Sequence, residues 1–145
     1  MQQNDENTNA FLIHISAFAG YLFPFGSIIT PLIIWQTLKK RSYFLDEHGK
    51  QAVNFNISFG IYIFILSASF FSIIFGNFFD VFNGINVNID FGNNHFSNHG
   101  IFGVFGAFSL VGLITLIKIA LIIIAAMKAN KGENYKYPFT INFIK

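Results

Sequence analysis

The sequence predicts an all-α integral membrane protein, a helical bundle with three spans of which the first is broken by prolines. Hydrophobic residues make up 53% of its 145 residues, and charged residues only 11%. A soluble domain carries about 25% charged residues, so much of this surface must face lipid. The apolar residues also gather in runs long enough to cross a hydrocarbon core of about 30 Å.

The boundaries of the apolar runs divide the chain into a polar N-terminal tail and one membrane domain. Residues 1–10 carry no Lys or Arg, which a cleaved signal peptide would need, so the first run is expected to be retained. The expected segments are a tail at 1–10 and a single membrane domain at 11–145, with spans at about 11–38, 51–79 and 101–127, a loop at 80–100 and a basic C-terminal tail at 128–145.

The first apolar run is the least regular of the three. Pro24 and Pro31 each remove a backbone donor, and Gly26 lies between them. One kinked span is the main prediction, because two crossings of the membrane would need more residues. A re-entrant hairpin that turns at Phe23 to Gly26 is the alternative.

The second and third spans differ in the residues that are expected to pack against other helices. Amides and hydroxyls in a membrane need partners, so the polar face of the second span is expected to point toward other helices. Small residues in the third span permit close approach of a neighbouring helix. The polar face comprises Gln51, Asn54, Ser58, Tyr62, Ser69 and Ser72, and the small residues are Gly103, Gly106, Ala107 and Gly112.

The placement of the cations predicts the orientation in the membrane. With three spans, the connection at 39–50 and the tail at 128–145 share one side and hold every Lys and Arg except Lys118. Segments 1–10 and 80–100 hold no Lys or Arg. The positive-inside rule then places the protein in the cytoplasmic (inner) membrane with its N-terminus out and its C-terminus in. A hairpin in the first run would instead move the N-terminus inside.

Two polar segments resemble a family of small bacterial membrane proteins, the domain of unknown function four-eight-seven-zero. They are Asp46 to Asn56 (DEHGKQAVNFN) and Lys128 to Phe139 (KANKGENYKYPF), and His14-Ile15-Ser16 fits the first helix of the same family. The family is similar to Tic-twenty-like components of the chloroplast import machinery. The resemblance implies a helical membrane bundle and hints at translocation, but it implies no catalytic residue.

Several polar residues are candidates for function or packing. Lys118 lies about nine residues from Lys128, and a cation at that depth costs about 2.5–3.5 kcal/mol. Asp46 and Glu47 are expected to complement the dipole at the start of the second span, and Pro138 is expected to end the last helix. The candidates are His14, Asp46, Glu47, His48, Gln51, Asn54, Lys118, Asn130, Tyr137 and Pro138.

The function expected from these residues is non-enzymatic, a structural or assembly component of a membrane. The sequence offers no catalytic, cofactor or metal set and contains no cysteine. The expected partners are the lipid bilayer and a second copy or another membrane protein, and nucleic acid is not expected. The alternative is a transport, channel or translocation-like component that uses Lys118 and the polar face of the second span.

Overall fold

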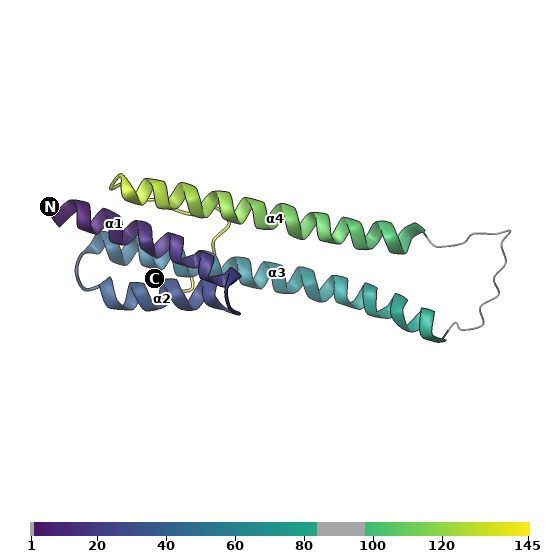
Figure 1. Cartoon of the computed structure of the whole chain (residues 1–145). Helices are drawn as coiled ribbons and strands as arrows, with labels where there is room; N and C mark the ends of the chain where they lie inside the picture. Colours follow the sequence, from purple (N-terminus) through teal and green to yellow (C-terminus); the bar gives the residue numbers. More distant parts are fainter. Residues whose placement is uncertain (1, 84–97) are drawn as a thin grey trace. The chain divides into compact units, whose positions relative to one another are not determined.

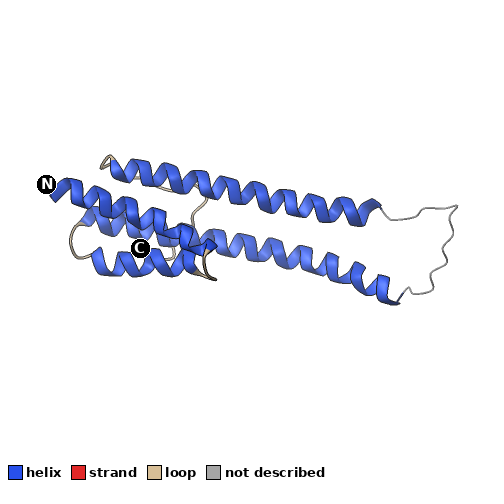
Figure 2. Ribbon diagram, viewed as in Figure 1, coloured by secondary structure: helices blue, strands red, loops and turns tan. Residues whose placement is uncertain are grey.

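The computed structural model describes residues 2–83 and 98–145, and within these residues the chain forms helices and connecting loops but no strand (Figures 1 and 2). The all-α prediction is therefore confirmed. Residues 84–97, which make up most of the loop expected at 80–100, lie outside the described residues. The elements are α1 (Gln2–Ile15), the 3₁₀ helix η1 (Ser16–Tyr21), α2 (Gly26–Leu38), α3 (Tyr43–Asn83) and α4 (Asn98–Asn130).

The helices form two compact units, Met1–Ile61 with Leu116–Lys145, and Tyr62–Thr115. The first unit contains the apolar core, in which short alanine side chains on α1, α3 and α4 let the helices approach closely. Larger side chains from α1, α2 and α3 complete this core. Its buried members are Ala10, Ile13, Leu38, Leu45, Ala52 and Ala129, with Ile34 and Phe44 packed against them.

Two helical segments, rather than the three predicted, are long and apolar enough to cross a membrane within the described residues. They are Tyr43–Phe71 in α3 and Ser109–Asn130 in α4. The apolar helix α2 has 13 residues, which at 1.5 Å per residue is about 20 Å and too short for a hydrocarbon core of about 30 Å. The second and third expected spans therefore have counterparts, and the first does not.

The first apolar run folds back on itself at residues 22–25. The prediction of one kinked span is therefore wrong, and the turn lies where the hairpin alternative placed it. Phe25 has the left-handed backbone conformation (φ 62°) that reverses the chain before α2. A Cβ on Gly26 would overlap the backbone of Ala19, so only glycine permits η1 and α2 to pack this closely. Pro24 lies in the turn, whereas Pro31 lies inside α2 and does not end it.

The N-terminal residues belong to the bundle and do not form a separate tail. Helix α1 begins at Gln2, and Ala10 and Ile13 on it are completely buried. The side-chain amide of Asn7 donates to the backbone carbonyl of Asn130 at 3.3 Å. Because Asn130 is the last residue of α4, the N-terminal helix and the C-terminal end of α4 lie at the same level. This arrangement does not support the placement of the two termini on opposite sides of a membrane, and the orientation stays a prediction.

Helix α4 ends at Asn130 through a glycine cap, and not at Pro138 as predicted. The Glu133 N–H donates to the Lys128 carbonyl at 3.0 Å and the Gly132 N–H to the Ala129 carbonyl at 2.9 Å. Gly132 has φ 76°, the left-handed conformation that this type of cap requires. Pro138 follows six residues later, in an exposed turn with Phe139.

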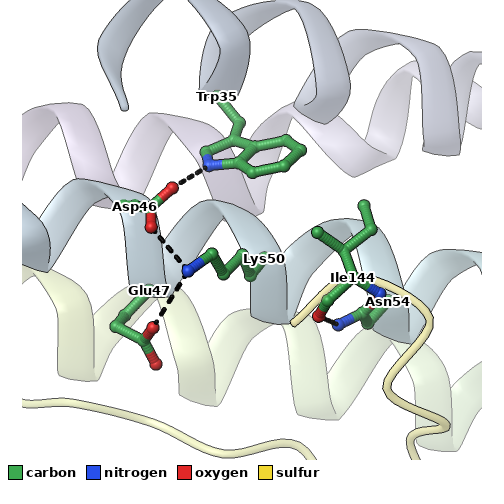
Figure 3. Close-up of polar contacts among 6 residues, drawn as sticks. All are labelled: Trp35, Asp46, Glu47, Lys50, Asn54 and Ile144. Atoms are coloured by element: carbon green, nitrogen blue, oxygen red, sulfur yellow. Dashed lines mark hydrogen bonds and ion pairs between the residues drawn. The ribbon is translucent and has the colours of Figure 1, made fainter. Parts of the chain in front are cut away.

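After α4, the C-terminal segment (residues 131–145) runs back along α3. The side-chain amide of Asn54 bonds both backbone groups of Ile144, donating to the carbonyl and accepting from the N–H at 2.9 Å each (Figure 3). The Ser58 hydroxyl accepts from the Ile141 N–H at 2.9 Å. These two residues of the polar face of α3 therefore hold the C-terminal segment and not another helix, contrary to the prediction.

Candidate functional site: a buried His–His–Tyr cluster beside a polar pocket

Two histidines and a tyrosine, distant in sequence, meet inside the first unit. His14 comes from α1, His48 from the second turn of α3, and Tyr137 from the C-terminal segment, and all three are buried. His14 Nε2 lies 2.8 Å from His48 Nδ1, and the Tyr137 hydroxyl lies 2.9 Å from His14 Nδ1. We call these residues the His–His–Tyr cluster. It joins three separate segments by hydrogen bonds.

Aromatic packing fixes the two ends of the cluster. The Tyr137 ring stacks on Phe55 of α3 with centroids 3.9 Å apart and planes at 14°. The edge of the His48 ring meets Phe44, one turn earlier on α3, at 4.4 Å. Such aromatic pairs hold the rings in orientations in which the hydrogen bonds remain short.

One arrangement of hydrogens satisfies the cluster best. If the Tyr137 hydroxyl donates to His14 Nδ1, then His14 Nε2–H donates to His48 Nδ1, and only the Nε2–H of His48 is left over. The reverse direction would leave both the phenol hydrogen and His48 Nε2 unsatisfied, which costs more. His48 Nε2 is indeed buried without a hydrogen-bond partner, although the backbone of Glu133 lies near the ring.

Burial keeps the cluster uncharged. Desolvation, with a smaller contribution from His48, lowers the pKa of His14 to about 3. Desolvation, with a contribution from Tyr135, raises the pKa of Tyr137 well above its ordinary value of 10. His14 is therefore a neutral imidazole and Tyr137 a neutral phenol at physiological pH, as the hydrogen-bond arrangement requires.

We expect acid to destabilise the first unit through His14. Its folded-state pKa of about 3 lies below the unfolded value of 6.5. Stability is therefore complete above pH 6.5 and is lost as the pH falls toward 3, by about 2 kcal/mol at pH 5. Melting curves in detergent at pH 8 and pH 5 measure this loss, and His14→Gln should make it smaller. An unchanged difference between the two pH values in His14→Gln would contradict the prediction.

A second polar group joins α2 to the start of α3 (Figure 3). The Trp35 indole N–H donates to Asp46 Oδ1 at 2.9 Å. Lys50 Nζ lies 2.6 Å from Asp46 and 3.5 Å from Glu47. The expectation that Lys50 pairs with Asp46 or Glu47 is confirmed, but it misses a further role of Asp46, which fixes the Trp35 indole of α2 against α3.

A pocket of about 320 Å³ opens beside the cluster. It lies between the first turns of α3 and the part of the C-terminal segment that follows the α4 cap. We call it the tail pocket. Its lining residues are Tyr43, Glu47, His48, Gln51, Asn134, Tyr135 and Lys136.

Most of the predicted candidates thus converge on one end of the first unit, and two do not. His14, His48 and Tyr137 form the cluster, while Glu47 and Gln51 line the tail pocket. Asp46 and Asn54 hold α2 and the C-terminal segment, and Asn130 accepts from Asn7. Lys118 is half-buried in α4 and makes no hydrogen bond or ion pair within the described residues, and Pro138 is exposed.

Sequence reasoning missed the residues that the C-terminal segment brings to this end. For Tyr135 and Lys136 the sequence indicates only anchoring at the membrane interface, because nothing in a helical periodicity shows that an extended segment returns along α3. Phe55 gives no signal either, since it is one of 21 phenylalanines. The polar face of α3 is the available signal, but it does not identify its partner.

Comparison with known proteins identifies the family. A model of the MamF/MmsF family matches residues 5–144, nearly the whole sequence. The chain belongs to the magnetosome magnetite crystal formation protein family. It is thus a membrane protein involved in magnetosome magnetite crystal formation. No curated protein and no solved structure matches the chain significantly.

This assignment corrects the resemblance inferred from the two polar segments. The matching family is MamF/MmsF, and not the domain of unknown function four-eight-seven-zero or its Tic-twenty-like relatives. The segments DEHGKQAVNFN and KANKGENYKYPF contain residues of the cluster and the pocket. They therefore describe how this end of the bundle folds, and the implied hint of translocation falls with the resemblance.

Proposed function

We propose that the chain is a non-enzymatic structural component of the membrane in which magnetite forms, with both termini on one face and the segment at 80–100 on the other. The observation that carries this proposal is the joining of α1, the start of α3 and the C-terminal segment by the His–His–Tyr cluster. Two helices that are long and apolar enough to span, and the position of α1 beside the end of α4, support an even number of crossings.

The charges of the two faces support the same arrangement. The face with both termini holds every Lys and Arg except Lys118, whereas the segment at 80–100 holds Asp80 and Asp90 and no Lys or Arg. By the positive-inside rule the cationic face is cytoplasmic. The segment at 80–100 then faces the opposite compartment.

Cysteine accessibility tests this topology, and the cysteine-free sequence needs no background removal. Single cysteines at Asn7, Ser42, Asn94 and Asn134 would be labelled by an impermeant maleimide in intact cells of a bacterium that forms no magnetite, where the expressed chain enters the cytoplasmic membrane. Labelling of permeabilised cells gives the total amount of each cysteine that can react. We expect labelling of intact cells at Asn94 alone. Labelling at both Asn7 and Asn94 would mean three crossings and would overturn the proposal.

We further propose that the chain assembles with a second copy or with another membrane protein. A Cβ placed at Gly106 or Gly112 of α4 would contact nothing within 4 Å among the described residues. Gly106 and Gly112 therefore do not serve close packing within the described part of the chain, and another helix could approach there. Blue-native electrophoresis in mild detergent should show an oligomer, which Gly112→Leu weakens; a monomer alone would count against assembly.

Transport is the alternative that Lys118 favours, since no hydrogen bond or ion pair holds this cation within the described residues. Lys118→Leu distinguishes the two functions, with the exposed Lys131→Leu as the matched control. If Lys118 has a structural role, Lys118→Leu should raise the melting temperature, because about 2.5–3.5 kcal/mol of insertion cost is relieved. Magnetite crystals in cells with this variant should then have normal size by electron microscopy. Loss of ion flux in proteoliposomes, with Lys131→Leu normal, would favour transport.

A further inference from the structure

The tail pocket has the size and the lining of a binding site for a small polar group. Its volume of about 320 Å³ would hold about ten waters. Its walls carry two phenols, two side-chain amides, a carboxylate, an imidazole and an ammonium group. Each of these side chains carries a polar group that a polar ligand could bond, although more of the lining surface is apolar than polar.

His48 closes the inner wall of the pocket. Its side chain is buried, as only 1% of the residue is exposed, and its Nε2 has no hydrogen-bond partner. The other ring nitrogen is held by His14 at 2.8 Å, which fixes the ring. The ring is thus a fixed part of the wall, and its Nε2 lies next to the backbone of Glu133.

The two charged residues of the pocket are not paired with each other. Lys136 makes no ion pair within the described residues, and Glu47 bonds Lys50, outside the pocket, at a long 3.5 Å. The pocket thus offers one ammonium, several neutral donors and one carboxylate. A ligand that fits this set carries an anionic and a cationic group close together.

The position of the pocket indicates where such a ligand comes from. Tyr43, Glu47 and Gln51 belong to the first turns of the spanning segment Tyr43–Phe71. Asn134 to Lys136 follow the end of the other spanning segment by a few residues. Both walls therefore lie at the end of a span, where tyrosine and lysine side chains meet lipid headgroups.

We propose that the tail pocket binds the headgroup of a phospholipid that carries a phosphodiester and a primary ammonium, as in phosphatidylethanolamine. Lys136 serves the phosphodiester, with the phenols and amides as further donors. Glu47 serves the ammonium. The bound lipid joins α3 to the C-terminal segment beside the His–His–Tyr cluster.

Native mass spectrometry of the full-length protein in detergent tests this site. The probes are short-chain phosphatidylethanolamine, short-chain phosphatidylglycerol, diacylglycerol and inorganic phosphate. We expect phosphatidylethanolamine to bind most tightly, and Lys136→Gln to weaken it at least about tenfold, because a bond to a charged group typically contributes that much. Lys131→Gln removes the same charge from an exposed position outside the pocket and should change little.

Glu47→Gln separates the two charges of the headgroup. It should weaken the binding of phosphatidylethanolamine and not that of phosphatidylglycerol. Glu6→Gln, on α1 away from the pocket, should change the binding of neither lipid. Unchanged Trp35 emission would verify the fold of each variant. Equal losses in Lys136→Gln and Lys131→Gln would overturn the proposal, as would binding of inorganic phosphate or diacylglycerol as tightly as phosphatidylethanolamine. Binding in detergent does not depend on membrane orientation, so this test is separate from the topology test.

Discussion

Tyr137→Ala is expected to destabilise the first unit by about 3–5 kcal/mol, the usual cost of deleting a buried aromatic side chain. The ring is 6% exposed and stacks on Phe55, and its hydroxyl bonds His14. The truncation leaves a cavity and an unpaired imidazole in the same place. The melting temperature in detergent, followed by Trp35 fluorescence, should fall, and a protease should cut the C-terminal segment faster.

Two variants separate the contributions of Tyr137. Tyr137→Phe retains the stacking on Phe55 but leaves His14 Nδ1 unpaired, so it should cost about 1–3 kcal/mol. Tyr135→Ala removes a neighbouring ring that is only partly buried and should cost less than either change at Tyr137. Equal melting temperatures for Tyr137→Ala and Tyr135→Ala would show that the C-terminal segment does not insert its tyrosine into the bundle.

Gly49→Ala is expected to destabilise the protein, although alanine is the better helix former. Gly49 lies in α3 directly against the Trp35 indole, and a Cβ on it would overlap the ring. The indole cannot retreat easily, because its N–H is held by Asp46 at 2.9 Å. The overlap should cost about 1–3 kcal/mol, which exceeds the gain in helix propensity of about 1 kcal/mol.

Gly60→Ala is the matched control for this change. Gly60 lies on the same helix, and a Cβ at this position would meet only a methyl carbon of Ile28 at 3.8 Å, an ordinary contact. This substitution should therefore stabilise α3. Gly49→Ala should thus lower the melting temperature and Gly60→Ala should raise it, with both measured in the same detergent. A stabilising Gly49→Ala would contradict the close packing of α2 on α3.

The helical class and two of the spans were predictable, because composition and the length of apolar runs determine them directly. The hairpin in the first apolar run was less predictable. Pro24 and Gly26 indicated a weak point in the first run, but they suit both a kink and a reversal. Whether the run kinks or reverses depends on whether η1 packs on α2. The close approach of Gly26 to Ala19 permits this packing, and no local sequence pattern reveals it.

The site was predictable only in its parts. His14, His48 and Tyr137 each stood out as polar groups near apolar runs, but their hydrogen bonds join positions 34 and 123 residues apart. The position of α1 beside the end of α4 was missed for the same reason. Charge placement grouped the cationic segments, but it does not show that Asn7 bonds Asn130.

Cross-linking of α1 to the end of α4 tests the central claim most directly, that both ends of the chain meet at one level. Asn7→Cys with Asn130→Cys would be treated with a short bis-maleimide, in a background that has no other cysteine. Asn7→Cys with Ser109→Cys is the control, since Ser109 lies about 30 Å from Asn130 along α4. We expect an internal cross-link in the first pair only. A cross-link in the Ser109 pair, with none in the Asn130 pair, would contradict the claim.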